Sequence, residues 1–109
     1  MSKKDSLSEV TFSRYSLALY ELADESNLVK DIENQALTMV DLISKSEDLK
    51  FCIKSPTINK GELEKLINII SEKTNINELF KRFLLFLIDK RRFFYVDRIL
   101  KEFIETCSK

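Results

Sequence analysis

The sequence predicts an all-α protein, a compact six-helix bundle. Glycine and proline each occur once, at Gly61 and Pro56, whereas average usage predicts roughly seven and five. Sheets need many tight turns and therefore many turn residues, so this chain is expected to be mostly helical. Apolar residues make up 44% and charged residues 33%, a balance typical of a folded globular protein. The length accommodates one domain with one core, and we expect residues 1–109 to form it.

Apolar residues at helical spacing predict the first two helices. Ser6 and Glu9 have the spacing of a capping box, so the first helix is expected over about 9–24. The second helix is expected over about 28–45. Its apolar positions recur three and four residues apart, at Leu28, Ile32, Ala36, Met39, Val40 and Ile43.

Polar residues that can cap a helix mark the third and fourth helices. Ser46 precedes a short helix that Pro56 ends, because the residue before a proline disfavours helical backbone. Asn59 and Glu62 have capping-box spacing and predict a fourth helix through about Lys73.

A run of six apolar residues distinguishes the fifth helix. Asn75 and Glu78 predict its start, and it is expected to end near Lys90. Residues 83–88, Phe-Leu-Leu-Phe-Leu-Ile, point in every direction around the axis, because each residue turns the helix by about 100°. This helix therefore either runs through the middle of the bundle or offers one face to a partner. A sixth helix is expected over about 93–107.

The composition excludes several classes of function. The chain has no histidine and so lacks the commonest general base and metal ligand. Its two cysteines, Cys52 and Cys107, lack the spacing of a zinc site, and a single glycine cannot build a phosphate-binding loop. Most carboxylates lie three or four residues from a Lys or Arg, as on a solvated helix face. We therefore expect no catalytic residues, no cofactor and no metal, and interpret the protein as a binding module rather than an enzyme.

Charge and hydropathy indicate where the protein works. Residues 1–50 hold six basic against ten acidic side chains and residues 51–109 hold twelve against eight, leaving −4 and +4. This asymmetry is too small for a nucleic-acid footprint. No signal peptide is recognisable, and the longest apolar run is far short of the ~20 residues of a membrane-spanning helix. We expect a soluble, cytoplasmic protein with no direct membrane insertion.

The first candidate binding site is a groove between the first and fifth helices. Each helix carries a stripe of neighbouring residues, and small Ala18 would leave a depression between larger side chains. The stripes consist of Tyr15, Ala18 and Leu22 on the first helix and Leu79, Arg82 and Phe86 on the fifth. If the two helices are neighbours, the groove could accept an amphipathic helix from a partner. Spacing alone slightly favours the alternative that all of these residues belong to the core.

The second candidate is Lys90–Tyr95, three cations followed by three aromatic residues. These side chains could contact phosphates and stack on bases, so the alternative function is a small helical RNA-binding domain of the antitermination-factor type. The cations equally suit a helix C-terminus, and no wider basic surface supports an RNA site, so we expect no nucleic-acid partner. A homodimer through the apolar fifth helix is a third possibility.

Three segments, in this order, resemble a known family. Residues 14–23, RYSLALYELA, are similar to the R-Y-A-x-A-L-F/Y-x-x-A signature of the delta subunit of bacterial F-type ATP synthases. This subunit is the counterpart of the mitochondrial oligomycin-sensitivity-conferring protein. Residues 49–56 are similar to the family's F-x-x-x-L-x-S/N-P segment, and residues 83–93 to its N-F-L-x-x-L-x-E/D-N-G/K-R-L/F segment. Each motif is weak alone, but three in register are fairly specific.

The resemblance implies a non-catalytic stator component on the inner face of the plasma membrane. In the family, this N-terminal domain sits on the catalytic head and holds the N-terminal helix of an alpha subunit between its first and fifth helices. That contact keeps the head from turning with the rotor during proton-driven ATP synthesis. A second domain binds the peripheral stalk, and we expect this chain to lack it. The implied partner-binding residues are Tyr15, Ala18, Leu22, Arg82 and Phe86, with Leu79 as a weaker addition.

The resemblance also sharpens the expectation for the fifth helix. Phe86 would face the groove, while Phe83, Leu84, Leu87 and Ile88 would hold the helix in the bundle.

Two positions depart from the family pattern. Arg82 stands where the family usually has Asn, which motivates the hypothesis that it pairs with an acidic residue of the partner helix. Lys90-Arg91 replaces a common Asn-Gly turn, so we expect this turn to be built in another way, for example by continuing the helix.

Overall fold

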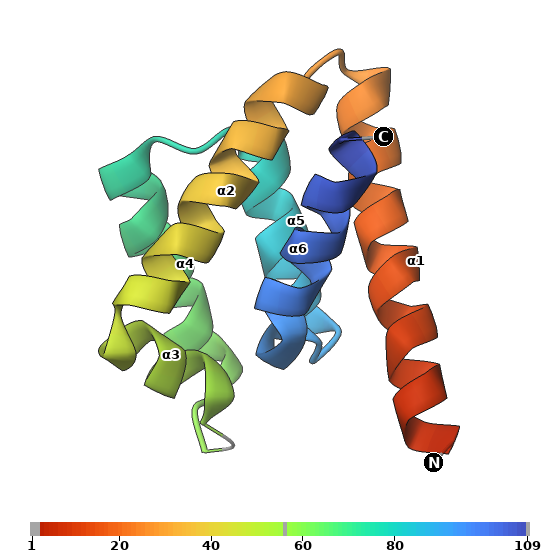
Figure 1. The fold of residues 1–109 in the computed structure, drawn as a ribbon. Helices are drawn as coiled ribbons and strands as arrows, with labels where there is room; N and C mark the ends of the chain where they lie inside the picture. Colours follow the sequence, from red (N-terminus) through yellow and green to blue (C-terminus); the bar gives the residue numbers. More distant parts are fainter. Residues whose placement is uncertain (1–2, 56, 109) are drawn as a thin grey trace.

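A computed structural model describes residues 3–55 and 57–108, with side chains from Phe12 onward. These residues form six α-helices and one 3-10 turn, with no strand among them, which confirms the all-α prediction (Figure 1). The elements are α1 (Lys3–Glu25), α2 (Val29–Lys45), α3 (Glu47–Lys54), α4 (Lys60–Thr74), α5 (Glu78–Asp89), η1 (Phe93–Tyr95) and α6 (Val96–Cys107). None of the helices in these ranges combines the length and hydropathy that a membrane crossing requires.

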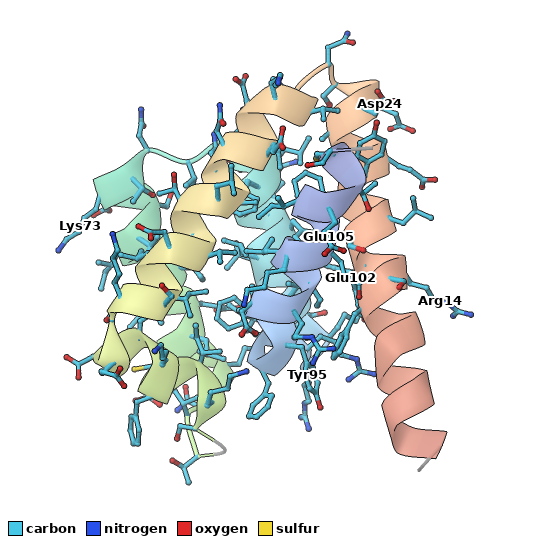
Figure 2. The ribbon with its side chains drawn as sticks, in the orientation of Figure 1. Arg14, Asp24, Lys73, Tyr95, Glu102 and Glu105 are labelled. Carbon is cyan, nitrogen blue, oxygen red and sulfur yellow. The ribbon has the colours of Figure 1, made fainter. Side chains whose placement is uncertain are left out.

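The helix α6 lies between α1 and α2, with α5 behind it in Figure 1. It packs along α1 on one side and along α2 on the other, while α4 pairs with α5. Figure 2 shows Glu102 on α6, where its Oε1 accepts a hydrogen bond from Ser13 Oγ of α1 at 3.0 Å. The radius of gyration, 13.5 Å, is close to the ~13 Å expected of a compact chain of about 100 residues.

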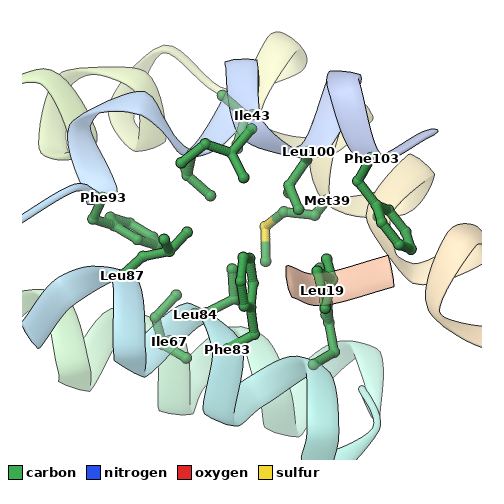
Figure 3. Packing of buried hydrophobic residues seen from close by; sticks show 14 of the residues in the cluster. Leu19, Met39, Ile43, Ile67, Phe83, Leu84, Leu87, Phe93, Leu100 and Phe103 are labelled. Carbon is green, nitrogen blue, oxygen red and sulfur yellow. The ribbon is translucent and has the colours of Figure 1, made fainter. Parts of the chain in front are cut away.

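One hydrophobic cluster fills the space between the helices, and every α-helix contributes to it (Figure 3). The largest side chains without solvent exposure are Leu19, Ile32, Ile67, Phe80, Leu84, Leu87, Val96, Ile99, Leu100 and Phe103. The buried residues of α5, from Phe80 to Ile88, recur three and four positions apart, so α5 turns one face toward this core.

Two helix starts follow the sequence prediction. The Ser46 Oγ accepts a hydrogen bond from the backbone N–H of Leu49 at 3.1 Å and caps α3. Asn59 and Glu62 form the predicted capping box on α4, with bonds of 2.9 and 3.2 Å. The residue before Pro56 has extended backbone, as a following proline favours, and Pro56 itself lies outside the described residues.

The first and last helices begin differently from the prediction. The helix α1 starts at Lys3, so Ser6 lies inside it and the predicted cap is wrong. Residues 3–6 contain no glycine or proline that would break a helix, and α1 therefore extends past the capping pattern. The sixth helix was expected from 93, but α6 starts at Val96. A tighter 3-10 turn precedes it, in which the last N–H donates to the Arg92 carbonyl at 3.0 Å.

Asn75 ends α4 instead of starting α5, so this predicted cap is also wrong. Its φ of 56° and ψ of 49° are left-handed, and its N–H donates to the Ser71 carbonyl at 2.8 Å. Asn77 takes the capping role, because its Oδ1 accepts a hydrogen bond from the Leu79 N–H at 2.8 Å. Asparagine tolerates left-handed backbone better than most residues, and Asn27 after α1 also has a positive φ, 58°.

The turn after α5 does not continue the helix, contrary to the expectation for Lys90-Arg91. The helix ends at Asp89, and Arg91 adopts a left-handed φ of 61°. The Arg91 N–H donates to the Ile88 carbonyl at 3.0 Å, and the Arg92 N–H donates to the Leu87 carbonyl at 2.8 Å. These bonds make the Schellman motif that usually has glycine at the left-handed position. The turn thus takes a glycine-type geometry although an arginine occupies it.

Candidate partner-binding groove

The apolar run in α5 has one exposed aromatic side chain. Phe83, Leu84, Leu87 and Ile88 are buried, as expected of the residues that hold α5 in the bundle. Phe86 is 43% exposed, which confirms the prediction that it points away from the core. The same helix therefore contributes one face to the core and another to the surface.

A groove of about 730 Å³ lies between α1 and α5. Five of the six predicted partner-binding residues line it, which brings together the two stripes expected from the sequence. The complete lining is Ala18, Glu21, Leu22, Glu25 and Ser26 from α1 and the turn after it, and Glu78, Leu79, Arg82, Phe83 and Phe86 from α5. The sixth predicted residue, Tyr15, does not line the groove but contacts one of the residues that do.

The groove follows from the way α1 divides its residues between core and surface. Leu19 and Ala23 are fully buried, whereas Ala18 and Leu22, each one position earlier, are exposed. One position is about 100° around a helix, so each exposed residue lies beside a buried one. Because the Ala18 side chain is a single methyl group, it leaves room between Leu22 and Tyr15 on either side of it along the stripe.

An aromatic contact bounds the groove at Phe86. The rings of Tyr15 and Phe86 meet edge to face, with centroids 5.8 Å apart and an interplanar angle of 63°. The Lys90 Nζ lies 5.7 Å from the centroid of the Phe86 ring, within range of a cation–π interaction. These two neighbours restrict where the exposed ring can point, and Tyr15 joins the two helices here.

The charged residues of the groove are mostly acidic. Glu21, Glu25 and Glu78 line it together with one cation, Arg82. The Arg82 Nε donates to Glu78 Oε2 at 3.1 Å, across one turn of α5, and both side chains are exposed. These three glutamates were not predicted from the sequence, although the spacing of the two on α1 could have indicated that they share the face of Ala18. Glu21 and Glu25 lie three and seven positions after Ala18, on the same face of α1.

The segment considered for RNA binding does not present its three aromatic rings to solvent as one surface. Phe93 is buried in the core, and Tyr95 packs against Phe12 with ring centroids 4.9 Å apart. Phe94 is 45% exposed, and Lys54 covers its ring with Nζ 4.5 Å from the centroid. The rings of Phe94 and Tyr95 meet edge to face with centroids 5.2 Å apart, but Phe93 lies in the core, so the three rings do not form one stacking surface.

A second hollow, of about 560 Å³, lies where α4 meets the end of α5. The Lys60 Nζ donates to Asp89 Oδ1 across it at 2.8 Å. This hydrogen bond, with the attraction between the two charges, lowers the pKa of Asp89 and raises the pKa of Lys60. Within the described ranges, no group of three or more Cys, Asp or Glu residues is placed to hold a metal ion.

Comparison with known proteins gives one consistent family. A family model described as ATP synthase delta (OSCP) subunit matches residues 12–109. The ATP synthase subunit delta of Pelagibacter ubique (strain HTCC1062) is 54% identical over 108 residues, which make up 99% of this chain and 58% of that protein. The ATP synthase subunit delta of Chelativorans sp. (strain BNC1) is 29% identical over 109 residues, covering 100% of this chain and 59% of that protein.

A third relative gives a similar match. The ATP synthase subunit delta of Clostridium botulinum (strain Hall / ATCC 3502 / NCTC 13319 / Type A) is 36% identical over 89 residues. These residues cover 82% of this chain and 49% of that protein. The chain thus spans between about half and three fifths of the length of these curated relatives.

Proposed function

The chain belongs to the ATP synthase delta (OSCP) subunit family, and from that membership we propose that it is a non-catalytic stator component of an F-type ATP synthase. It works at the inner face of the plasma membrane as part of that complex. Its task is to hold the catalytic head, so that the head does not turn with the rotor during proton-driven ATP synthesis.

The partner that we assign to the groove is the N-terminal helix of an alpha subunit. The observation that carries this proposal is the apolar groove between α1 and α5, where Ala18, Leu22, Leu79 and Phe86 lie side by side. An amphipathic helix can bury its apolar stripe in such a groove and leave its polar face in water. Tyr15 and Arg82 complete the proposed contact at its edges.

The chemistry of the groove suits this kind of binding. Each 100 Å² of apolar surface removed from water contributes roughly 2.5 kcal/mol, before the cost of association is subtracted. Leu22 and Phe86 are both more than two fifths exposed, so they retain apolar surface that a partner can cover. Phe83, which also lines the groove, is already buried and forms part of its floor.

Calorimetry with a peptide of the alpha-subunit N-terminus tests the proposal. We expect the peptide to bind the 109-residue chain and to gain helical circular dichroism on binding. Ala18→Asp should weaken binding by about a hundredfold or more, because the partner helix would bury a carboxylate without a counter-charge. The variant should remain folded, because position 18 is exposed and aspartate costs only about 0.5 kcal/mol in helix propensity.

Leu17→Asp is the matched control. Leu17 is 51% exposed on the same helix, adjacent to Ala18, and does not line the groove. The Leu17→Asp substitution introduces the same aspartate at a similar cost in helix propensity. Because position 17 lies outside the groove, the affinity of this variant for the peptide should stay close to that of the wild type. If Ala18→Asp binds as tightly as Leu17→Asp, the groove is not the site.

A further inference from the structure

The charge of the groove indicates the chemistry of the helix that it accepts. Three carboxylates, of Glu21, Glu25 and Glu78, face one guanidinium, of Arg82, which leaves a formal charge of −2 on the lining. The guanidinium is already paired with Glu78 at 3.1 Å. Among the residues whose side chains are described, no cation lies within ion-pair distance of Glu21 or Glu25.

These carboxylates are concentrated at one end of the groove. Glu21 and Glu25 belong to the last two turns of α1, and Glu78 is the first residue of α5. The opposite end is bounded by Tyr15 and Phe86, with the cation of Lys90 near the Phe86 ring. The groove therefore changes from acidic to aromatic along its length, while its floor stays apolar.

We propose that the occupant is an amphipathic helix with Lys or Arg side chains beside its apolar stripe, at the end that lies over Glu21 and Glu25. This inference rests on the function proposed above and specifies the partner's charge. A helix with acidic residues at that end would meet two carboxylates of like charge, which disfavours binding. The basic side chains of the partner helix would therefore pair with the glutamates of α1. Arg82 is not needed for a charge contact, because its guanidinium is already paired with Glu78.

The test compares two peptides and two pairs of substitutions. One peptide is the alpha-subunit N-terminus, and the other is the same peptide with every Lys and Arg replaced by Gln. The variant Glu21→Gln/Glu25→Gln removes the acidic charges of α1. We expect it to bind the native peptide about three- to tenfold more weakly than the wild type at low ionic strength. It should bind the Gln-substituted peptide as the wild type does.

Salt provides a second reading, because exposed charge pairs are screened over about 10 Å at 0.1 M ionic strength. Raising the ionic strength should bring the affinities of wild type and variant for the native peptide together. Glu72→Gln/Glu105→Gln is the matched control, since it makes the same change in net charge at exposed sites outside the groove. That control should bind both peptides with wild-type affinity.

The outcomes separate this inference from the proposed function. Suppose that Ala18→Asp abolishes binding of the native peptide but Glu21→Gln/Glu25→Gln leaves its affinity unchanged. The inference about charge is then overturned, and the groove stands as the binding site. An equal loss with Glu72→Gln/Glu105→Gln also overturns it, because the effect would then reflect net charge alone. If Ala18→Asp leaves the native peptide bound, both proposals fall.

Discussion

The helix α1 has two flanks that differ in how they are covered. The flank toward α6 and the core buries Leu19 and Ala23 completely, and Ser13 adds a hydrogen bond to α6. The flank toward α5 leaves Ala18 and Leu22 exposed above a groove. We call these the seam and the groove. If the groove binds the proposed partner, α1 assigns stability and recognition to different residues, so that each can be changed without the other.

The largest effect should come from breaking the seam. Leu19 has no solvent exposure and points into the core cluster (Figure 3). We expect Leu19→Ala to lower the free energy of unfolding by about 3–5 kcal/mol, because it leaves a cavity. Urea denaturation monitored by circular dichroism measures this change.

Leu22→Ala makes the same substitution on the groove flank, where the side chain is 46% exposed. It should lower the free energy of unfolding by about 1 kcal/mol or less and instead weaken binding of the proposed partner peptide. Equal destabilisation by the two substitutions would refute the distinction between the flanks.

Breaking the groove comes next in size. Phe86→Ala removes an exposed ring and its contact with Tyr15, and we expect the alpha-subunit peptide to bind roughly tenfold or more weakly. Stability should fall by about 1 kcal/mol at most, since the side chain is only partly buried. Phe94→Ala is the control, because Phe94 has almost the same exposure, 45%, outside the groove. Calorimetry should find no change in affinity for that variant.

A change in the turn between α5 and η1 should alter stability without altering recognition. Arg91 has a left-handed φ of 61°, which glycine adopts without a steric penalty. We expect Arg91→Gly to raise the free energy of unfolding by about 0.5–1 kcal/mol and to leave peptide binding unchanged. Lys90→Gly should destabilise the protein instead, because Lys90 has a negative φ of −86° and gains nothing from glycine. A stabilising Lys90→Gly would contradict this account of the turn.

The smallest effect is expected from the ion pair of Lys60 and Asp89, which touches neither flank. The pKa of Asp89 is lowered in the folded protein from its ordinary value of 3.8, so the pair stabilises the fold above that pH. The contribution should disappear as the pH falls through the lower, folded-state pKa. Thermal unfolding between about pH 5 and pH 2 should therefore show less acid sensitivity for Asp89→Asn than for the wild type. An unchanged pH dependence would show that this exposed pair contributes nothing measurable.

The helices and the two stripes of the groove could be predicted from the spacing of apolar residues, because period and burial are linked by geometry. Spacing alone slightly favoured burial of those stripes, and the exposure of Phe86 was expected only from the family resemblance. The capping box of Asn59 was also predictable, because its two side chains satisfy backbone groups within four residues of each other.

Other features depend on choices that the local sequence leaves open. Asn75 has a glutamate three residues later, as Asn59 does, but it ends a helix because asparagine also accepts left-handed backbone. No local sequence signal marks the left-handed backbone of Arg91. Two hydrogen bonds to the end of α5 offset the steric cost of this conformation. The acidic end of the groove was missed because Glu21 and Glu78 become neighbours only when α1 and α5 pack together.

The seam has a consequence for how the protein is made. During synthesis the chain emerges from its N-terminus, so α1 is complete long before residues 96–107 of α6 exist. Until then α1 lacks the helix against which it packs most extensively, and one wall of the groove has no fixed position. Under the function proposed above, the groove would therefore be complete for a partner helix only after α6 has been synthesised.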